Sequence, residues 1–163
     1  MKLLIIGDGR HGKDTVAEML AERGLSFKSS SYHCLHRAIM PATGDTLPLY
    51  SSEDQCYEDR INHRDEWKRL ISEYNTPKDR LVKEILEEHD VYVGLRKRDE
   101  FEAAKSHFDC IVWVDRSAHL PPEESNDMTI DDADLVVDNN SSLSELKINV
   151  GLLFNDLQEL YND

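Results

Sequence analysis

The 163-residue chain has few basic residues and lacks any long hydrophobic run. It carries 33 acidic against 19 basic residues, a formal net charge of −14, which makes duplex nucleic acid a poor partner because duplexes are bound by cationic faces. No apolar run approaches the roughly 20 residues of a membrane-spanning helix. The run that ends at Gly7 is also too short for the core of a signal peptide. We therefore expect a cytoplasmic protein with no membrane partner.

Cysteine is scarce as well, with three residues that form no spaced pair: Cys34, Cys56 and Cys110. An odd number of cysteines without an export signal favours reduced thiols over disulfides. The histidines closest to a cysteine, His33 and His36, fit a helix surface better than a zinc site, which requires four convergent ligands. These shortages exclude a disulfide-stabilised fold and disfavour a structural zinc site.

The length favours one domain over residues 1–163, and short apolar runs predict its class. Runs of this kind suit strands that are buried on both faces of a parallel sheet. The expected strands are 2–6, 90–94, 110–114 and 134–138, with a possible further strand at 26–29. Segments of helical spacing alternate with these strands, which implies right-handed crossovers. The predicted fold is a three-layer α/β domain whose mostly parallel sheet is covered by helices on both faces.

The segments between the strands carry recognisable start and stop signals. Helices are expected at 13–23, 32–39, 52–74, 77–88, 98–107 and from 143 onward. Thr76 and Asp79 resemble a capping box, as do Ser142 and Glu145. Residues 116–129 include two prolines and form a loop long enough to act as a lid.

One motif carries chemistry, because residues 7–15 read G-D-G-R-H-G-K-D-T between the first strand and the first helix. The pattern G-x-x-x-x-G-K in this context binds oligophosphates. Its glycines let backbone N–H groups curve around the phosphates, the helix N-terminus adds a positive dipole, and Lys13 bridges the terminal phosphates. A simple glycine-rich turn is the disfavoured alternative. The predicted nucleotide-binding residues are Gly7, Asp8, Gly9, Arg10, His11, Gly12, Lys13, Asp14 and Thr15.

The loop departs from the usual pattern at Asp14, where a hydroxyl residue normally follows the lysine. Thr15 supplies a hydroxyl one place later, about 100° further round the helix, where it can reach the α-phosphate. Asp14 can hold Mg²⁺ directly or through water, or it can be an acidic first-turn residue favoured by the helix dipole. Asp115, at the end of an apolar strand, is a further candidate for the Mg²⁺ site, with a turn residue as its alternative.

Basic residues gather in the middle of the chain, so an acidic molecule can keep one local positive site. The arginines in question are Arg60, Arg64, Arg69, Arg80, Arg96, Arg98 and Arg116. Arg60 and Arg64 are four residues apart, a spacing that places them on one face of the predicted helix. Arg96 and Arg98 follow a strand at the end of the sheet where α/β proteins bind ligands. A solvated polar helix face and exposed charge runs are the alternatives.

Four segments together resemble one enzyme family. They are G-K-D-T in the loop, D-V-Y-V-G-L-R at 90–96, I-V-W-V-D-R at 111–116 and A-D-L-V-V-D-N-N-S-S at 133–142. The chain is similar to the deoxynucleoside monophosphate kinases of tailed bacteriophages, within the P-loop nucleoside monophosphate kinase superfamily. The resemblance covers nearly the whole chain in order. It departs from cellular relatives by lacking D-G-x-P-R after the third strand and by having only Arg116 as a basic residue at the lid.

The resemblance implies that ATP and Mg²⁺ serve phosphoryl transfer to a (deoxy)nucleoside monophosphate, in the host cytoplasm if a phage encodes the protein. Positioning and cations dominate such catalysis, and an acceptor that is already a phosphate anion needs no general base. The implied catalytic residues are Lys13, Arg96, Arg98 and Arg116. The acceptor would contact Arg60, Arg64 and Arg96 in or beside a helical region at about 30–75. Asn139 and Asn140 would lie beside the donor base.

Two other functions stay open on the sequence. The sparse lid and Asp14 are compatible with a nucleotide-binding regulator that transfers no phosphoryl group. The same loop would also serve a kinase for another small acceptor, such as a nucleoside. In each case the partners are small-molecule nucleotides, and the chain is expected to be a monomer or a homodimer.

Overall fold

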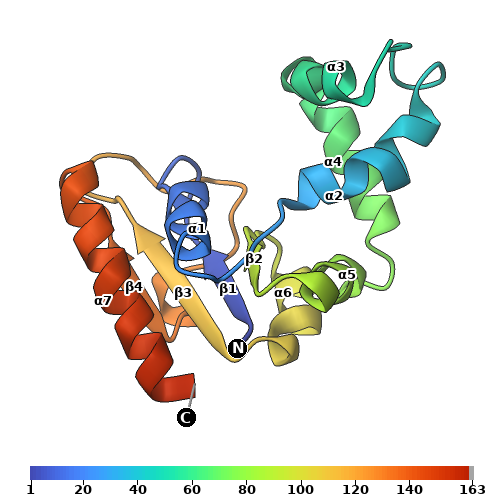
Figure 1. Cartoon of the computed structure of the whole chain (residues 1–163). Helices are drawn as coiled ribbons and strands as arrows, with labels where there is room; N and C mark the ends of the chain where they lie inside the picture. Colours follow the sequence, from blue (N-terminus) through green and yellow to red (C-terminus); the bar gives the residue numbers. More distant parts are fainter. Residues whose placement is uncertain (162–163) are drawn as a thin grey trace.

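A four-stranded parallel sheet lies at the centre of the computed structural model, which describes residues 1–161 (Figure 1). Its strands are β1 (Leu3–Ile6), β2 (Val91–Val93), β3 (Cys110–Asp115) and β4 (Leu135–Asp138), in the order β2-β1-β3-β4. All four residues of β1 are buried, as expected of a strand that is covered on both faces. The possible strand at 26–29 is reduced to one parallel bridge between Phe27 and Val91, beside β2.

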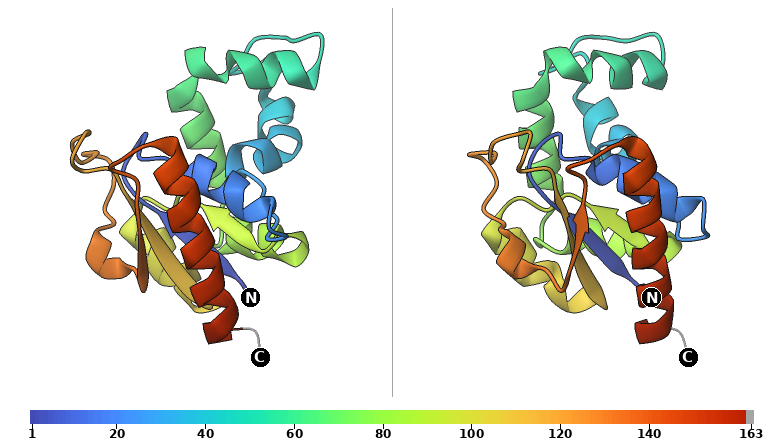
Figure 2. Two further views of the ribbon diagram at one scale, coloured as in Figure 1. Left: turned by 60° about the vertical axis from the view of Figure 1, so that its left-hand side comes forward. Right: turned by 90° about the vertical axis from the view of Figure 1, so that its left-hand side faces the viewer.

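Helices cover both faces of the sheet, and alternate residues of β1 face opposite layers. Leu3 and Ile5 pack on the side of α1 (Lys13–Ala21) and α7 (Leu143–Tyr161), which lie next to each other in Figure 2. On the other side, Leu4 and Ile6 pack with residues of α5 (Arg80–Glu88) and α6 (Arg98–Ala104). This arrangement confirms the predicted three-layer α/β fold.

The segment from 30 to 74 forms a helical region that extends past the sheet on the β2 side (Figure 1). It contains α2 (Ser30–Cys34), a π-helical turn (Leu35–Ile39), a 3-10 turn (Met40–Ala42), α3 (Glu53–Glu58), a 3-10 turn (Asp59–Asn62) and α4 (Arg64–Tyr74). A separate cluster that includes Leu35, Ile39 and Trp67 forms its small core. The region therefore has its own packing, distinct from the two layers on the sheet.

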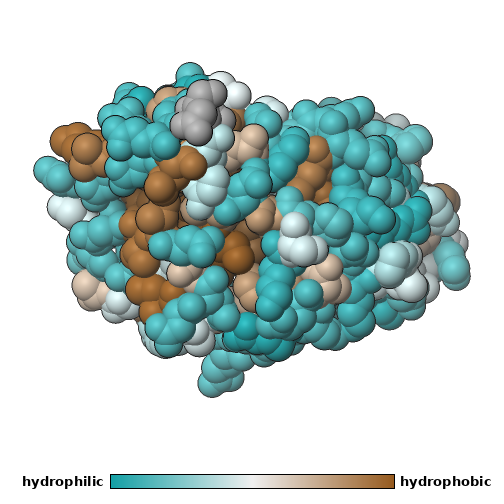
Figure 3. Space-filling view, turned by 90° about the horizontal axis from the view of Figure 1, so that it is seen from below, coloured by the Kyte–Doolittle hydropathy of each residue, from teal (hydrophilic) through white to brown (hydrophobic). Residues whose placement is uncertain are grey.

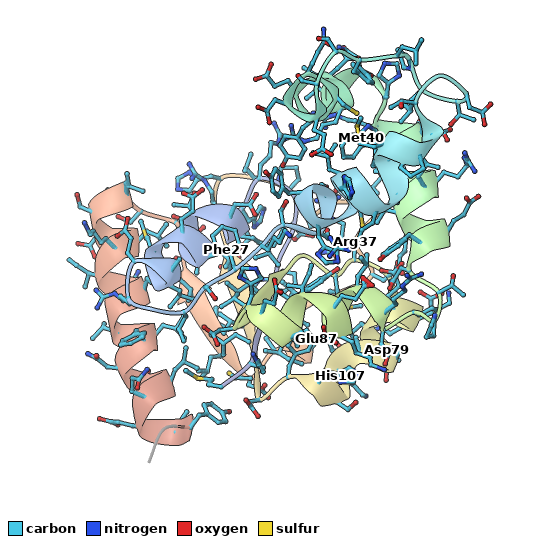
Figure 4. All side chains as sticks on the ribbon, turned by 45° about the vertical axis from the view of Figure 1, so that its right-hand side comes forward. Phe27, Arg37, Met40, Asp79, Glu87 and His107 are labelled. Atoms are coloured by element: carbon cyan, nitrogen blue, oxygen red, sulfur yellow. The ribbon has the colours of Figure 1, made fainter. Side chains whose placement is uncertain are left out.

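Side-chain contacts tie this helical region and its neighbours to the sheet layers. The Glu84 carboxylate of α5 accepts hydrogen bonds from the Tyr74 hydroxyl of α4 at 2.8 and 2.9 Å, and lies 3.0 Å from His33 Nε2 of α2. At the start of α5, Asp79 Oδ2 lies 2.9 Å from His107 Nε2, and the two residues come close together in Figure 4. The hydrogen bond from His107 holds the pKa of Asp79 below its usual value.

Of the two predicted capping boxes, the one at Thr76 is wrong, whereas at α7 Ser142 caps the helix as predicted. Helix α5 begins at Arg80, and the Thr76 hydroxyl donates back to the Glu73 carbonyl at 3.0 Å instead of capping the helix that follows. The predicted capping box at Thr76 is therefore wrong, because its hydroxyl is used at the end of α4. At α7 the expectation holds, since Ser142 Oγ accepts from the Glu145 N–H at 3.1 Å.

The surface reflects the acidic, polar composition. The face in Figure 3 is largely hydrophilic, with hydrophobic side chains gathered toward one side. Within residues 1–161, no helix combines the length and apolar character needed to cross a membrane. Cys34, Cys56 and Cys110 are all free and buried.

Candidate active site

The predicted phosphate-binding motif, residues 7–15, forms the turn between β1 and α1, at the carboxyl end of the sheet. We call this turn the phosphate loop, or phosphate-binding loop. Gly12 is the N-cap of α1 and adopts a left-handed conformation with φ 100°. No side chain caps this helix start, so the amides of its first turn have no side-chain acceptor. Together with the helix dipole, these N–H groups make a site for an anion.

Glycine is required at two positions of the loop because the ends of β3 and β4 pack against it. A Cβ at Gly12 would lie 2.5 Å from Asn139 Nδ2, and one at Gly7 would lie 2.8 Å from the Val114 carbonyl oxygen. The Asn139 amide is buried and donates to the His11 carbonyl at 2.8 Å. The loop shape is therefore held by contacts from two neighbouring strands.

Lys13 folds back over this loop. Its Nζ donates to the carbonyls of Gly7 and Asp8, both at 2.9 Å. Burial lowers the pKa of Lys13, and the charge of Arg96 lowers it further, while Glu123 and other acids oppose the change. An ammonium group has three donors, so one remains for a phosphate oxygen.

The loop at 116–129 lies on the phosphate-binding loop. Asp8 is buried, and its Oδ1 accepts from the Glu123 N–H and from Asn126 Nδ2, both at 3.1 Å. Glu123 Oε1 also lies 3.4 Å from a guanidinium nitrogen of Arg96. No sequence pattern marks Glu123 or Asn126, because these contacts join residues more than 100 positions apart.

At the base of this loop, Arg116 meets His11. The Arg116 N–H donates to His11 Nδ1 at 3.0 Å, so the ring proton lies on Nε2. That Nε2 and Arg116 Nε are both buried without a hydrogen-bond partner, and no ion pair within residues 1–161 involves Arg116. Buried donors without acceptors are unfavourable, so this pair suits a bound anion.

A cavity of about 720 Å³ opens between the phosphate loop, the end of β2 and the helical region. Its basic lining residues are Lys13, Arg60, Lys68, Arg69, Arg96 and Lys97. Its acidic lining residues are Asp14 and Glu100, and burial raises the pKa of Glu100. A chain with a net charge of −14 therefore carries a local excess of positive charge at one cavity.

The two arginines expected on one helical face are separated by a break. Arg60 lies in the 3-10 turn, 4.0 Å from the centre of the Tyr57 ring, and lines the cavity. Arg64 begins α4 beyond His63, whose φ −135° and ψ 35° interrupt the helix; it is exposed and does not line the cavity. The predicted shared face is wrong because one helix has become three short elements.

Arg96 and Arg98 also differ in their surroundings. Arg96 lines the cavity, whereas Arg98 does not. The Arg98 guanidinium donates to both carboxylate oxygens of Asp132, at 2.8 and 2.9 Å, and to the Asp127 carbonyl at 3.1 Å. Arg98 thus fastens the end of the 116–129 loop and the turn that follows it.

The three candidate Mg²⁺ residues differ in their surroundings. Asp14 is exposed and lines the cavity, and Thr15 follows it in the first turn of α1. Asp115 Oδ1 accepts from the Ser117 N–H and its Oδ2 from Asn140 Nδ2, both at 3.1 Å. Burial favours a higher pKa for Asp115, but these hydrogen bonds outweigh it and hold the pKa below its usual value.

Asn139 and Asn140 both support the site. Asn139 holds the His11 carbonyl, as described above. Asn140 Nδ2 also donates to Asp138 Oδ1 at 2.7 Å, and its Oδ1 accepts from the Ala118 N–H at 3.0 Å. Their amides are therefore engaged with the protein, at the ends of β3 and β4.

The fold is shared with solved structures, among them two kinases. The shikimate kinase of Aquifex aeolicus is 16% identical, with a TM-score of 0.54 over 98% of this chain and 99% of that one. The dephospho-CoA kinase of Campylobacter jejuni is 14% identical, with a TM-score of 0.51 over 98% of each chain. TT1252 of Thermus thermophilus is 16% identical, with a TM-score of 0.51 over 96% of this chain and 97% of that one. At these identities the likeness establishes the fold alone.

No protein-family model and no curated protein sequence matches the chain.

Proposed function

We propose that the protein transfers the γ-phosphoryl group of ATP to a small anionic acceptor, a (deoxy)nucleoside monophosphate. The observation that carries this proposal is an uncapped helix start with Lys13 at one end of a cavity rich in basic residues. The helix start with Lys13 suits a polyphosphate donor, and the basic residues of the cavity suit an anionic acceptor. The similarity to kinase structures supports phosphoryl transfer, and the resemblance to phage enzymes supports a nucleoside monophosphate as acceptor.

The donor phosphates would lie on the amides of the loop and of the first turn of α1. Lys13 would exchange its bonds to the loop carbonyls for bonds to phosphate oxygens. Arg116 and His11 offer buried donors without partners beside this loop. Their cationic and N–H groups would balance the negative charge that spreads over the transferring phosphoryl group.

Mg²⁺ would neutralise the donor phosphates and orient them. Within residues 1–161, no group of three acidic, histidine or cysteine side chains could hold a metal ion alone. This fits Mg²⁺, which keeps several waters and binds through one or two carboxylates together with substrate phosphates. Asp14 faces the cavity and would supply that carboxylate, directly or through water, with Thr15 as the alternative.

The acceptor phosphate would bind between Arg60 and Arg96. An oxygen of this phosphate attacks the γ-phosphorus, and the bond from that phosphorus to the bridging oxygen of ADP breaks as the new bond forms. Because the attacking oxygen is already anionic, no general base is needed. Arg64 and Arg98 do not line the cavity and would take no part in the reaction. The helical region at 30–75 would contribute Arg60 to the acceptor site.

Two alternatives have support of their own. The structural neighbours include kinases named for shikimate and dephospho-CoA, so a kinase for another small acceptor is the second candidate. A regulator that binds nucleotide without turnover is the third. In all cases we propose that the protein acts in the cytoplasm, that of the host cell if a phage encodes it, as a monomer or homodimer.

A coupled assay of ADP release from ATP, with each ribo- and deoxyribonucleoside monophosphate in turn, tests the proposal. We expect turnover with at least one monophosphate, and we expect Lys13→Ala to reduce it by about 100-fold or more. Lys83→Ala removes an exposed lysine of α5 outside the cavity and should keep full activity. Undiminished turnover by a folded Lys13→Ala variant would contradict the role of the lysine, and nucleotide binding without turnover would favour the regulator.

A further inference from the structure

The carboxylate of Glu123 lies at the mouth of the phosphate-binding loop. A Cβ at Gly9 would lie 3.0 Å from Glu123 Oε2 and 3.1 Å from its Cδ, so the carboxylate rests directly on the loop. Glu123 Oε1 lies 3.4 Å from Arg96, and the negative charge of Glu123 raises the pKa of Lys13. One acidic side chain thus faces two of the cations that the proposed reaction uses.

The Glu123 backbone is fixed in this position by the loop itself. Its N–H donates to Asp8 Oδ1 at 3.1 Å, and Asn126 Nδ2 donates to the same oxygen and, at 3.4 Å, to the Gly7 carbonyl. The segment from Glu123 to Asn126 therefore forms a strap across the phosphate loop.

Only one of the two oxygens of the Glu123 carboxylate accepts a hydrogen bond. Glu123 Oε1 accepts from the Ser125 hydroxyl at 3.1 Å, but Oε2 is buried and has no hydrogen-bond partner. A buried carboxylate oxygen without a donor is unfavourable and persists where the surroundings impose it. The cations beside Glu123 supply the attraction that keeps it there.

We propose that Glu123 is an internal competitor for the donor phosphates: its carboxylate lies where the loop and Arg96 would hold an anion, and a nucleotide must displace it to bind. This inference rests on the proposed function. A carboxylate and a phosphate carry the same sign and cannot share the space between the loop and Arg96. A di- or triphosphate, which makes several contacts with the loop amides, displaces the strap more readily than a single phosphate does.

The substitution Glu123→Gln tests this competition, because it removes the charge and keeps the shape. The neighbouring Glu124 is exposed, so Glu124→Gln makes the same change in net charge without touching the loop. Calorimetric titration with ADP and with pyrophosphate should show binding about tenfold tighter for Glu123→Gln than for the wild type or Glu124→Gln, since the competent state is more populated. Equal or weaker binding by Glu123→Gln would overturn the proposal.

Hydrogen exchange in the absence of ligand gives a second readout of the strap. Backbone amides of 123–126 should exchange faster in Glu123→Gln than in Glu124→Gln, and equal exchange would also overturn the proposal. The two failures can be told apart. If the wild type binds ADP and Glu123→Gln binds no tighter, the competition alone is wrong; if none of the three proteins binds ADP or pyrophosphate, the proposed function fails and the competition fails with it.

Discussion

The phosphate loop and the helical region that borders the cavity are built in different ways. The loop is fixed by backbone packing that only glycine allows, with Gly12 against Asn139 and Gly7 against the Val114 carbonyl. The helical region is joined to the sheet layers by polar side chains, with Glu84 of α5 bonded to both α2 and α4. The comparison indicates that the proposed donor site tolerates almost no change in shape, whereas the proposed acceptor site depends on individual side chains.

The largest effect is expected from Gly12→Ala in the loop. A Cβ there meets Asn139 Nδ2 and also requires a left-handed backbone, so we expect a loss of about 2–4 kcal/mol in stability and of nucleotide binding. Gly24→Ala is the matched control, since Gly24 has the same φ of 100° with open space around its Cβ. Chemical denaturation and ADP titration of both variants separate backbone strain from the clash. Nucleotide binding that survives in Gly12→Ala would disprove the tight packing of the loop.

A smaller and more selective effect is expected at the acceptor site. Arg60 lines the cavity and Arg64 does not, although they are four residues apart. Arg60→Ala should raise the KM for the acceptor by about tenfold, the loss of roughly one charge-assisted hydrogen bond, and leave the KM for ATP unchanged. Arg64→Ala should change neither value. If both substitutions raised the KM for the acceptor equally in steady-state kinetics, Arg60 and Arg64 would both contact the acceptor, as the sequence predicts.

The smallest effect concerns pH and the packing of the helical region. Burial lowers the pKa of His33 from 6.5, despite its hydrogen bond with Glu84. The folded state therefore binds a proton less readily than the unfolded chain, and stability is lost as the pH falls below about 6.5. For Glu84, burial favours a higher pKa, but hydrogen bonds from His33 and Tyr74 lower it overall, so its contribution is lost at still lower pH.

Urea denaturation at pH 7.5 and 5.5 measures this dependence. The wild type should lose more stability than His33→Gln between the two values. His36→Gln is the control for the loss of an exposed histidine, because that side chain is 80% exposed. If His33→Gln and the wild type lose the same amount, buried His33 is not the responsible group.

The sequence predicts best where the signals are local. The apolar run at 2–6 contains β1, the run at 110–114 matches all but the last residue of β3, and Ser142 caps α7 as expected. The phosphate loop also follows from residues adjacent in the chain. These features are marked by residues that lie close together in the chain, which a pattern can reveal.

The remaining features depend on distant contacts. Arg98 pairs with Asp132, 34 positions away, and Glu123 reaches Asp8 across 115. Neither pairing has a sequence pattern. The break at His63 was also missed, because polar residues on both sides fit one long helix as well as two short ones. Long-range ion pairs and turn geometry therefore decided which predicted cations line the cavity.

The central claim is that the amides from Gly9 to Thr15 and the Lys13 ammonium bind the phosphates of a nucleotide. Titration of isotopically labelled protein with ATP and Mg²⁺, followed by NMR through the backbone N–H signals, tests it most directly. We expect saturable chemical-shift changes that are concentrated on these amides and on the strap at 123–126. Unchanged loop signals at millimolar ATP and ADP would contradict it.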